Sequence, residues 1–242
     1  MALGYVRPAR PDEAEEIARI QLSTWRTAYR RLLPRHVLDE LDPGWLAQRW
    51  RAAIEEPPSA QHRVLVAVEQ AESSYGALTV GPGAAGGRAD RQSNLAGFAA
   101  TGPADEAALA PGEPPDALGA DVAAITELLV EPRWGRRGHG SRLLAATVDL
   151  WREDGFTTAL AWAYEQDPAT LAFLTGAGWA PDGARRALDI DDLLVPQLRL
   201  HVSVAEGTPA EGTSVEKSTS VEESTSVEES TEPDGEPRAL DH

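Results

Sequence analysis

The most informative segment of the chain is Val130-Glu-Pro-Arg-Trp-Gly-Arg-Arg-Gly-His-Gly-Ser-Arg-Leu-Leu144. The apolar run 123–130 that leads into it is typical of a buried strand, and residues 138–152 have the spacing of an amphipathic helix. Glycines remove Cβ atoms from the turn, so backbone amides, the positive end of the helix dipole and the guanidinium groups of Arg136 and Arg137 can surround an anion. The segment therefore predicts a pyrophosphate cradle between a strand and a helix.

Two other phosphate-binding motifs do not fit this turn. A P-loop ends in Gly-Lys-Ser/Thr, and the single lysine of the chain, Lys217, lies far from the turn. A dinucleotide-binding fingerprint needs a third glycine three residues after Gly140, where this chain has Leu143, and it normally belongs to the first strand–helix–strand unit. Both motifs are therefore excluded.

The chain around the cradle alternates between predicted strands and helices. Strands are predicted at 5–7, 64–68, 95–100, 123–130, 158–164, 187–190 and 198–204, and helices from Pro11, over 44–54, over 138–152 and from Asp167 to about Gly176. Segments 71–94 and 103–115, rich in glycine, serine or proline, predict loops. The strand–helix–strand unit at 123–164 favours a right-handed crossover, so the fold class is α/β, a mixed sheet with helices on its faces.

The last part of the chain has a different composition. A Thr-Ser-Val-Glu motif recurs every six residues from Thr213, and residues 205–242 hold eleven acidic residues against Lys217 and Arg238, a net charge of −9. So polar a segment has too little apolar surface to offset the entropy of ordering it. We therefore expect a domain over 1–204 and a disordered acidic tail over 205–242, with a solvated extension favoured over a partner-binding segment.

The composition also limits the class of protein. With 242 residues, 42% of them hydrophobic, the chain can fill one substantial core, and without cysteine it can form neither disulfides nor thiolate intermediates. The five histidines have no recognisable metal-ligand spacing, and no apolar stretch approaches the roughly 18 residues of a membrane span. Of the total charge of −17, the domain carries −8, which repels nucleic acid and attracts cationic amines, or simply maintains solubility. We expect a cytoplasmic protein with no metal, nucleic-acid or membrane partner.

Two ordered motifs resemble the GNAT superfamily of N-acetyltransferases. Ile125-x-x-Leu-x-Val-x-Pro132, followed by the turn 135–140, looks like that family's acetyl-CoA motif, whose turn is written Arg/Gln-x-x-Gly-x-Gly/Ala. Gly135 departs from the pattern by replacing Arg or Gln. Downstream, Asp167-Pro-Ala-Thr-Leu-Ala-Phe-Leu-Thr-Gly-Ala-Gly-Trp179 matches the spacing of a second family signature, Asn-x-x-Ala-x-x-Phe-Tyr-x-x-x-Gly-Phe.

The resemblance covers roughly residues 5–204 and implies a mostly antiparallel central sheet with helices on both faces. It also implies acetyl-CoA as cosubstrate, without a metal, and transfer of the acetyl group directly to a primary amine. The residues that it assigns to acetyl-CoA binding are Leu129, Val130, Gly135, Arg136, Arg137, Gly138, His139, Gly140, Ser141 and Asp167. The backbone N–H near Leu129 or Val130 would stabilise the oxyanion.

The side chains for proton transfer depart from the family pattern. Leu174 stands where many members have a tyrosine acid, and Ala124 stands where many have a strand carboxylate. Tyr164 and Glu127 are the substitute catalytic candidates, although Tyr164 can instead merely pack or cap the strand edge and Glu127 can instead form a salt bridge or face solvent. Strict strand alternation places Glu127 on the face opposite Ala124, unless a bulge turns it.

The acceptor side resembles the family at Trp25-Arg-Thr-Ala-Tyr29. Trp25 and Tyr29 lie four residues apart on one helix and could shape an acceptor pocket, although aromatic pairs at this spacing also form ordinary core. The expected partner is a small-molecule or peptide amine, bound by a monomer or homodimer. The alternative function is a catalytically inactive acyl-CoA-binding module for regulation or interaction, which the absence of a tyrosine at 174 and of a carboxylate at 124 would explain.

Overall fold

The computed structural model describes residues 4–70 and 93–205 of the 242-residue chain. The predicted acidic tail lies outside the described residues apart from Ala205, and so does most of the predicted loop 71–94. Within the two described ranges, no helix combines the length and the apolar character needed to cross a membrane.

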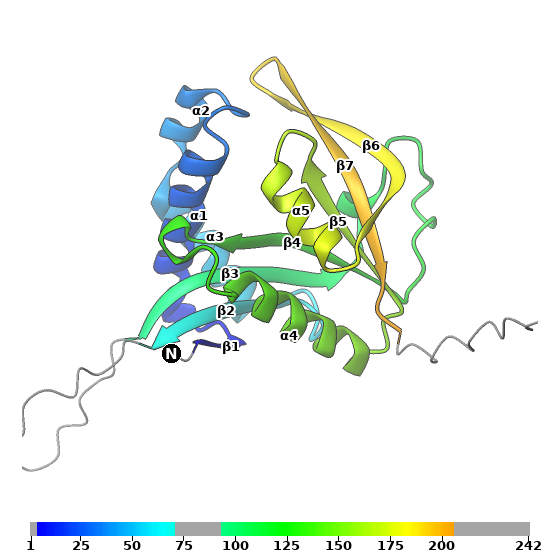
Figure 1. The fold of residues 1–242 in the computed structure, drawn as a ribbon, viewed down its shortest axis with the longest axis horizontal. Coiled ribbons are helices and arrows are strands. Elements are labelled where there is room, and N and C mark those ends of the chain that lie inside the picture. The colour runs from blue at the N-terminus through cyan, green and yellow to red at the C-terminus, as the bar shows by residue number, and fades with distance from the viewer. Residues whose placement is uncertain (1–3, 71–92, 206–242) are drawn as a thin grey trace, which may run out of the picture. The chain divides into compact units, whose positions relative to one another are not determined.

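Seven strands form one sheet in the order β1-β2-β3-β4-β5-β7-β6 (Figure 1). Only β4 and β5 pair in parallel, and every other pairing is antiparallel, as the mixed sheet predicted from the sequence requires. The strands are β1 (Gly4–Pro8), β2 (Arg63–Gln70), β3 (Ser93–Pro103), β4 (Val122–Val130), β5 (Thr158–Tyr164), β6 (Ala180–Ile190) and β7 (Leu193–Ser203).

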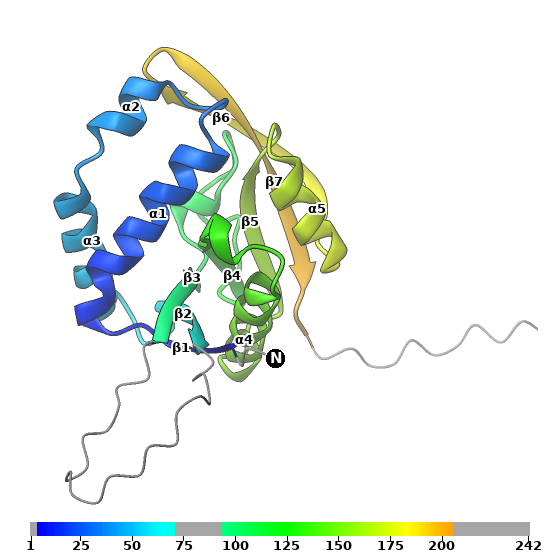
Figure 2. The same ribbon diagram turned by 60° about the vertical axis from the view of Figure 1, so that its left-hand side comes forward.

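Helices cover both faces of this sheet. Figure 2 shows α1 (Ala14–Ala28) and α3 (Pro43–Glu55) on one side of the strands, and α4 (His139–Glu153) and α5 (Pro168–Gly176) on the other. The short helix α2 (Arg35–Glu40) follows α1, and the 3-10 turns η1 (Pro11–Glu13), η2 (Glu106–Ala108) and η3 (Pro132–Trp134) join other elements. The predicted fold class and helix positions are confirmed.

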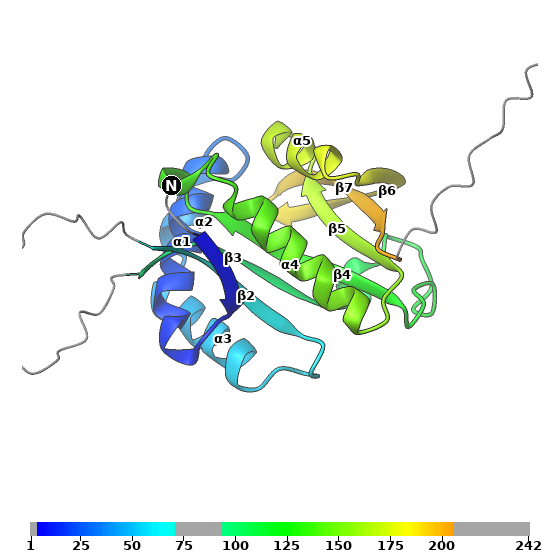
Figure 3. The same ribbon diagram turned by 60° about the horizontal axis from the view of Figure 1, so that its bottom comes forward.

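The apolar spacing of each helix explains which face it covers. Ile17 and Ile20 of α1 are fully buried against β2 and β3, whereas Leu143 of α4 packs on the opposite face of the same strands. Figure 3 shows α4 running across the sheet close to β3 and β4. Because successive strand residues point to opposite faces, both faces of β2 and β3 are apolar and both are covered.

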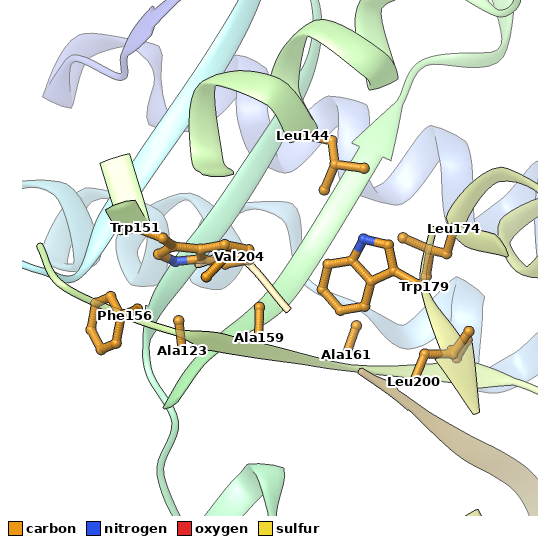
Figure 4. Close-up of a cluster of buried hydrophobic side chains, with 11 residues drawn as sticks. Ala123, Leu144, Trp151, Phe156, Ala159, Ala161, Leu174, Trp179, Leu200 and Val204 are labelled. Carbon is orange, nitrogen blue, oxygen red and sulfur yellow. The ribbon is translucent and has the colours of Figure 1, made fainter. Parts of the chain in front are cut away.

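A tryptophan-rich cluster fixes α4 and α5 to the sheet (Figure 4). Trp151 of α4 is fully buried, and its ring lies 6.4 Å from that of Trp179, the residue that ends the second motif. The indole Nε1 of Trp151 donates a hydrogen bond of 2.8 Å to Thr101 Oγ1, which itself donates to the carbonyl of Ala124. The polar atoms of Trp151 and Thr101 are thus satisfied, and the cluster holds α4 in register with β3 and β4.

The two parallel strands pair over only part of their length. Pairing between β4 and β5 ends at Ile125 and Ala161, although β4 continues to Val130 and β5 to Tyr164. Beyond this point β4 still pairs with β3, and β5 still pairs with β7. The sheet therefore opens into a V at its centre, with unpaired backbone groups of both strands facing the gap.

The structure differs from the sequence prediction mainly at the edges of the sheet. The strand β3 begins at Ser93 instead of Leu95, and β6 extends over seven residues that were not predicted as strand. This extension is rich in charged and small residues, is mostly exposed, and is held by antiparallel pairing with β7. Its strand conformation therefore comes from a long-range partner and not from local propensity.

Candidate active site

A cavity of about 480 Å³ fills the V between β4 and β5. Its wall is formed by the second half of β4, the end of β5, the turn before α4 and the first turns of α5. Cavities of a few hundred Å³ bind most small molecules and cofactors. We call it the cofactor cavity, after the ligand that the sequence predicts for this turn.

The turn at one end of this cavity exposes backbone amides. Gly138 is the N-cap of α4 with φ of 78°, and no side chain caps this helix. Arg136 also has a positive φ of 61°, which is unusual for a residue with a Cβ atom. The first intrahelical bond runs from Arg142 N to the Gly138 carbonyl at 3.0 Å, so the N–H groups of the preceding helical residues remain available to an anion.

The space above the turn depends on Gly140. A Cβ atom at Gly140 would lie 3.4 Å from the ring of Phe173 and 3.7 Å from a methyl of Val130, so a larger side chain there would have to displace the α5 side of the cavity. Arg136 is exposed and lines the cavity, whereas Arg137 does not line it. The Arg137 guanidinium stacks 4.9 Å from the Trp134 ring, with Nη1 3.6 Å from Glu69 Oε1. Of the two arginines, only Arg136 is placed to meet an anion.

A buried carboxylate holds the start of the turn against α1. Glu131, directly after β4, accepts hydrogen bonds from Arg19 at 2.7 Å and from Arg133 at 2.6 Å. Burial acts to raise the pKa of Glu131, but these two guanidinium groups outweigh it and lower the pKa, so the carboxyl stays ionised. The turn is thereby fixed to the first helix.

The backbone of β4 presents specific amides to the gap. Glu131 N donates to the carbonyl of Ala96 on β3, so the pair Phe98 and Leu129 is also hydrogen-bonded, because hydrogen-bonded pairs alternate in an antiparallel ladder. The N–H groups of Leu128 and Val130 must therefore point away from β3, into the cofactor cavity. Of the two amides named from the sequence, that of Val130 faces the cavity and that of Leu129 faces β3.

A β-bulge decides the direction of Glu127. The register of β3 and β4 shifts so that Ala100 pairs with Glu127 while Thr101 pairs with Ile125, which leaves Thr126 as the additional residue. Glu127 therefore lies on the α1 face together with Ala124, and strict alternation was the wrong prediction. Glu127 lines the cavity and reaches Gln21 of α1.

Glu127 belongs to a short chain of hydrogen bonds. Trp50 of α3 donates from Nε1 to Gln21 Oε1 at 2.7 Å, and Gln21 Nε2 donates to Glu127 Oε1 at 3.3 Å. Burial raises the pKa of Glu127 to about 7, and the bond from Gln21 opposes this increase. A carboxyl with a pKa near 7 can exchange a proton at neutral pH.

Two tyrosines meet near this carboxyl. The rings of Tyr29 and Tyr164 pack edge to face with centroids 5.0 Å apart, and both residues line the cofactor cavity. Burial raises the pKa of Tyr164, and the nearby charge of Glu127 raises it further, while Arg186 lowers it. Burial also raises the pKa of Tyr29, and the charge of Glu127 makes the next largest contribution in the same direction. Both phenols therefore remain protonated at neutral pH and can donate hydrogen bonds.

The remaining predicted residues have mixed surroundings. Trp25 lines the cavity from α1, and Asp167 also lines it, but the Asp167 carboxylate caps α5 by accepting from Ala169 N and Thr170 N, each at 3.1 Å. Leu174 is buried in the cluster under α5. His139 is buried, with Nε2 3.1 Å from Glu69 Oε2, and burial lowers the pKa of its imidazole.

The cavity brings together most of the residues that the sequence singled out. It is lined by Glu127 and Tyr164, by Trp25 and Tyr29, and by every residue assigned to acetyl-CoA binding except Arg137. The Leu128 amide and the role of Gln21 were not predicted from the sequence, and a bulge was considered only as an exception to strand alternation, without a position. A signal for Gln21 existed, because it is a polar residue four positions from Ile17 on the apolar face of α1.

Comparisons with known proteins agree with this geometry. Among curated proteins, the uncharacterized N-acetyltransferase YuaI of Bacillus subtilis (strain 168) is 24% identical over 168 residues, which are 69% of this chain and 76% of the relative. The PaiA N-acetyltransferase of Thermoplasma acidophilum, solved in complex with coenzyme A, has a TM-score of 0.53 at 12% identity, covering 83% of this chain and 99% of that one. A GCN5-related N-acetyltransferase of Kribbella flavida has a TM-score of 0.53 at 18% identity, covering 83% and 97%.

A family assignment follows from the sequence match together with the fold. The structural neighbours are too distant in sequence to establish more than the shared fold. Residues 45–179, which contain the β4 strand, the amide-lined turn and the α5 motif, match the acetyltransferase (GNAT) family. The protein therefore belongs to the acetyltransferase (GNAT) family, a family of N-acetyltransferase enzymes.

Proposed function

We propose that this protein transfers an acetyl group from acetyl-CoA directly to a primary amine. The observation that carries the proposal is the meeting of Glu127 and Tyr164 in the same cavity as the amide-lined turn before α4. Acetyl-CoA supplies an activated thioester. All other parts of the reaction are binding, orientation and proton transfer, which side chains and backbone groups of this chain can perform.

Acetyl-CoA binding is supported by the chemistry of the turn. The N–H groups of His139, Gly140 and Ser141 and the side chain of Arg136 would hold the pyrophosphate, because they combine the helix dipole with a cation that forms no ion pair with any residue in 4–70 or 93–205. The cavity-facing N–H groups of Leu128 and Val130 would hold the acyl arm along β4 and polarise the thioester carbonyl. Asp167 would contribute by fixing the start of α5, since its carboxylate is already occupied as a cap.

Proton transfer is assigned to Glu127 and Tyr164. An alkylamine with a pKa near 10 is mostly protonated at neutral pH, so it must lose a proton before it can attack. Glu127, with its pKa raised to about 7, is suited to accept that proton, directly or through water. Tyr164 stays protonated and would donate to the leaving thiolate, which replaces the acid that Leu174 cannot supply.

The alternative is an inactive acyl-CoA-binding module. It would be favoured if Glu127 and Tyr164 were buried away from the cavity, so that the cradle survived without proton-transfer groups. Both residues instead line the cavity, and their pKa values are raised by burial there. These observations favour an active acetyltransferase over the inactive module. A cytoplasmic location and a separate acidic tail over 205–242 remain part of the proposal.

Binding and turnover test the proposal separately. Calorimetric titration of the full chain with acetyl-CoA and CoA should give micromolar affinity, and release of free thiol should require a primary amine. The Tyr164→Phe variant should bind both nucleotides as tightly as the wild type while releasing thiol more slowly. Binding without turnover by any amine would support the inactive module, and absence of binding would refute the cradle.

A further inference from the structure

A second cavity, of about 590 Å³, lies on the α1 and α3 face of the sheet. Its wall includes α3, the segment before β2 and the end of β3. Trp25, Thr126 and Glu127 line both this cavity and the cofactor cavity. The two spaces therefore adjoin at the bulge of β4, where Glu127 borders both. We call the second space the indole cavity.

The wall of the indole cavity is mainly apolar and aromatic. Trp25, Trp45 and Trp50 all line it, together with Leu41 and Leu46. Trp50 is held in place by its bond to Gln21 and by edge-to-face packing on Phe98, with ring centroids 4.9 Å apart. A fixed indole surface favours a flat or bulky apolar group, because such a group loses hydrated area and gains aromatic contacts.

The charged groups around this cavity are unevenly distributed. Glu127 lies at the inner end, where the cavities meet. Asp105 caps the η2 turn by accepting from Ala107 N at 2.9 Å, and Arg63 is paired with Asp154. Arg49 is exposed and stacks 4.8 Å from the Trp45 ring, which is itself 49% exposed, so this pair marks the mouth. A ligand would meet an acid at the inner end and a cation at the mouth.

We propose that the indole cavity binds the acetyl acceptor, a small monoamine that carries an aromatic or bulky apolar group. The inference rests on the proposed function. The ammonium lies at Glu127, the apolar group lies among the tryptophans, and the thioester reaches the junction from the other cavity. Arg49 disfavours a second positive charge at the far end, so diamines and polyamines are poor acceptors.

The reaction balances with these groups alone. The acceptor nitrogen forms the amide bond as the thioester C–S bond breaks. Of the two protons that the ammonium loses, one passes to Glu127 and on to solvent. The other passes to the Tyr164 phenolate and replaces the proton that Tyr164 gives to the thiolate. Acetyl-CoA is the only co-reactant.

An acceptor panel tests the substrate class with the full chain. 2-Phenylethylamine, hexylamine, putrescine and a short peptide with a free N-terminus are compared by thiol release at a fixed, saturating concentration of acetyl-CoA. We expect kcat/KM to be highest for 2-phenylethylamine and lowest for putrescine. A preference for putrescine or for the peptide would overturn the inference while leaving the acetyltransferase function intact. If acetyl-CoA does not bind, both the proposed function and this inference fail.

Substitutions test whether the acceptor binds in the indole cavity. Trp45→Ala should raise KM for 2-phenylethylamine by about 3- to 10-fold, from lost aromatic contact, with kcat and the affinity for CoA unchanged. Ala53→Trp should fill the indole cavity and abolish acceptor binding without affecting CoA affinity. Tyr5→Ala is the matched control, because Tyr5 is 41% exposed and lines neither cavity. Unchanged KM in both Trp45→Ala and Ala53→Trp would refute the site.

Discussion

Replacing Glu127 with glutamine should stabilise the fold while removing most of the activity. The substitution keeps the size of the side chain but removes its charge. Burial raises the pKa of Glu127 from an ordinary value of 4.5 to about 7, with the bond from Gln21 acting in the opposite direction. At about 1.4 kcal/mol per pKa unit, ionising this group in the folded protein costs about 3 kcal/mol. The side chain borders two cavities, so solvent screening should reduce this cost. We therefore expect Glu127→Gln to raise the free energy of unfolding by about 1–2 kcal/mol.

The pH dependence gives this prediction a definite sign. The folded protein keeps the Glu127 proton to a higher pH than the unfolded chain does. Between about pH 4.5 and 7 the folded state therefore binds more protons, so this group lowers the stability of the wild type progressively as pH rises. The cost is complete above about pH 7. The Glu127→Gln variant has no such group, so its advantage should be small at pH 4.5 and largest at pH 8.

Urea unfolding of both proteins at pH 4.5 and pH 8, combined with thiol release at pH 8, tests both effects. Loss of a general base lowers the rate by roughly 10²- to 10⁴-fold. The wild-type kcat/KM should rise with pH through about 7, and the variant should lack this step. Equal unfolding free energies at pH 8, or a variant with wild-type turnover, would refute the assignment of Glu127 as a buried base.

Three further predictions concern other parts of the chain. Gly138→Ala should weaken CoA binding at least tenfold in calorimetry, because Gly138 forms part of the cradle and has a φ of 78°, which alanine rarely adopts. Gly155→Ala is the control: Gly155 follows α4 with a φ of 84°, so this variant should lose similar stability but keep the affinity for CoA. Gln21→Leu should shift the midpoint of the kcat/KM profile to higher pH, since the bond that lowers the pKa of Glu127 is lost; an unchanged midpoint would argue against that contact. Removing residues 206–242 should leave kcat/KM unchanged, and a loss of activity would assign the tail a role in catalysis.

The central supersecondary unit could be predicted because its signals are local. The apolar run of β4, the glycines at 138 and 140 and the helical spacing of α4 lie within one short segment, and each has a direct backbone cause. The two motifs, in their order along the chain, were enough to identify the family resemblance and to predict most of the residues that line the cofactor cavity. The same reasoning correctly placed Asp167 at the start of α5.

The direction of Glu127 could not be predicted in this way. It depends on a register shift between β3 and β4, which arises from pairing across the sheet. No residue type near Thr126 indicates this shift in the sequence. Likewise, Gln21 and Glu127 are 106 residues apart in sequence, and only packing of α1 on β4 brings them together. The pKa of that carboxyl is a property of its burial and therefore of the tertiary fold.

Local conformational preferences and hydrophobic periodicity specify the order of the elements, the amide-lined turn and the class of ligand that the turn suits, so these features could be predicted from the sequence. Contacts between distant segments set which amides of β4 face the gap, which carboxyl lines the same cavity as Tyr164, and that a second, tryptophan-lined cavity shares Glu127 with the first. These features depend on strand register and on helix packing between distant segments. Such contacts are set by the free energy of the whole fold, and a short window of sequence does not contain them.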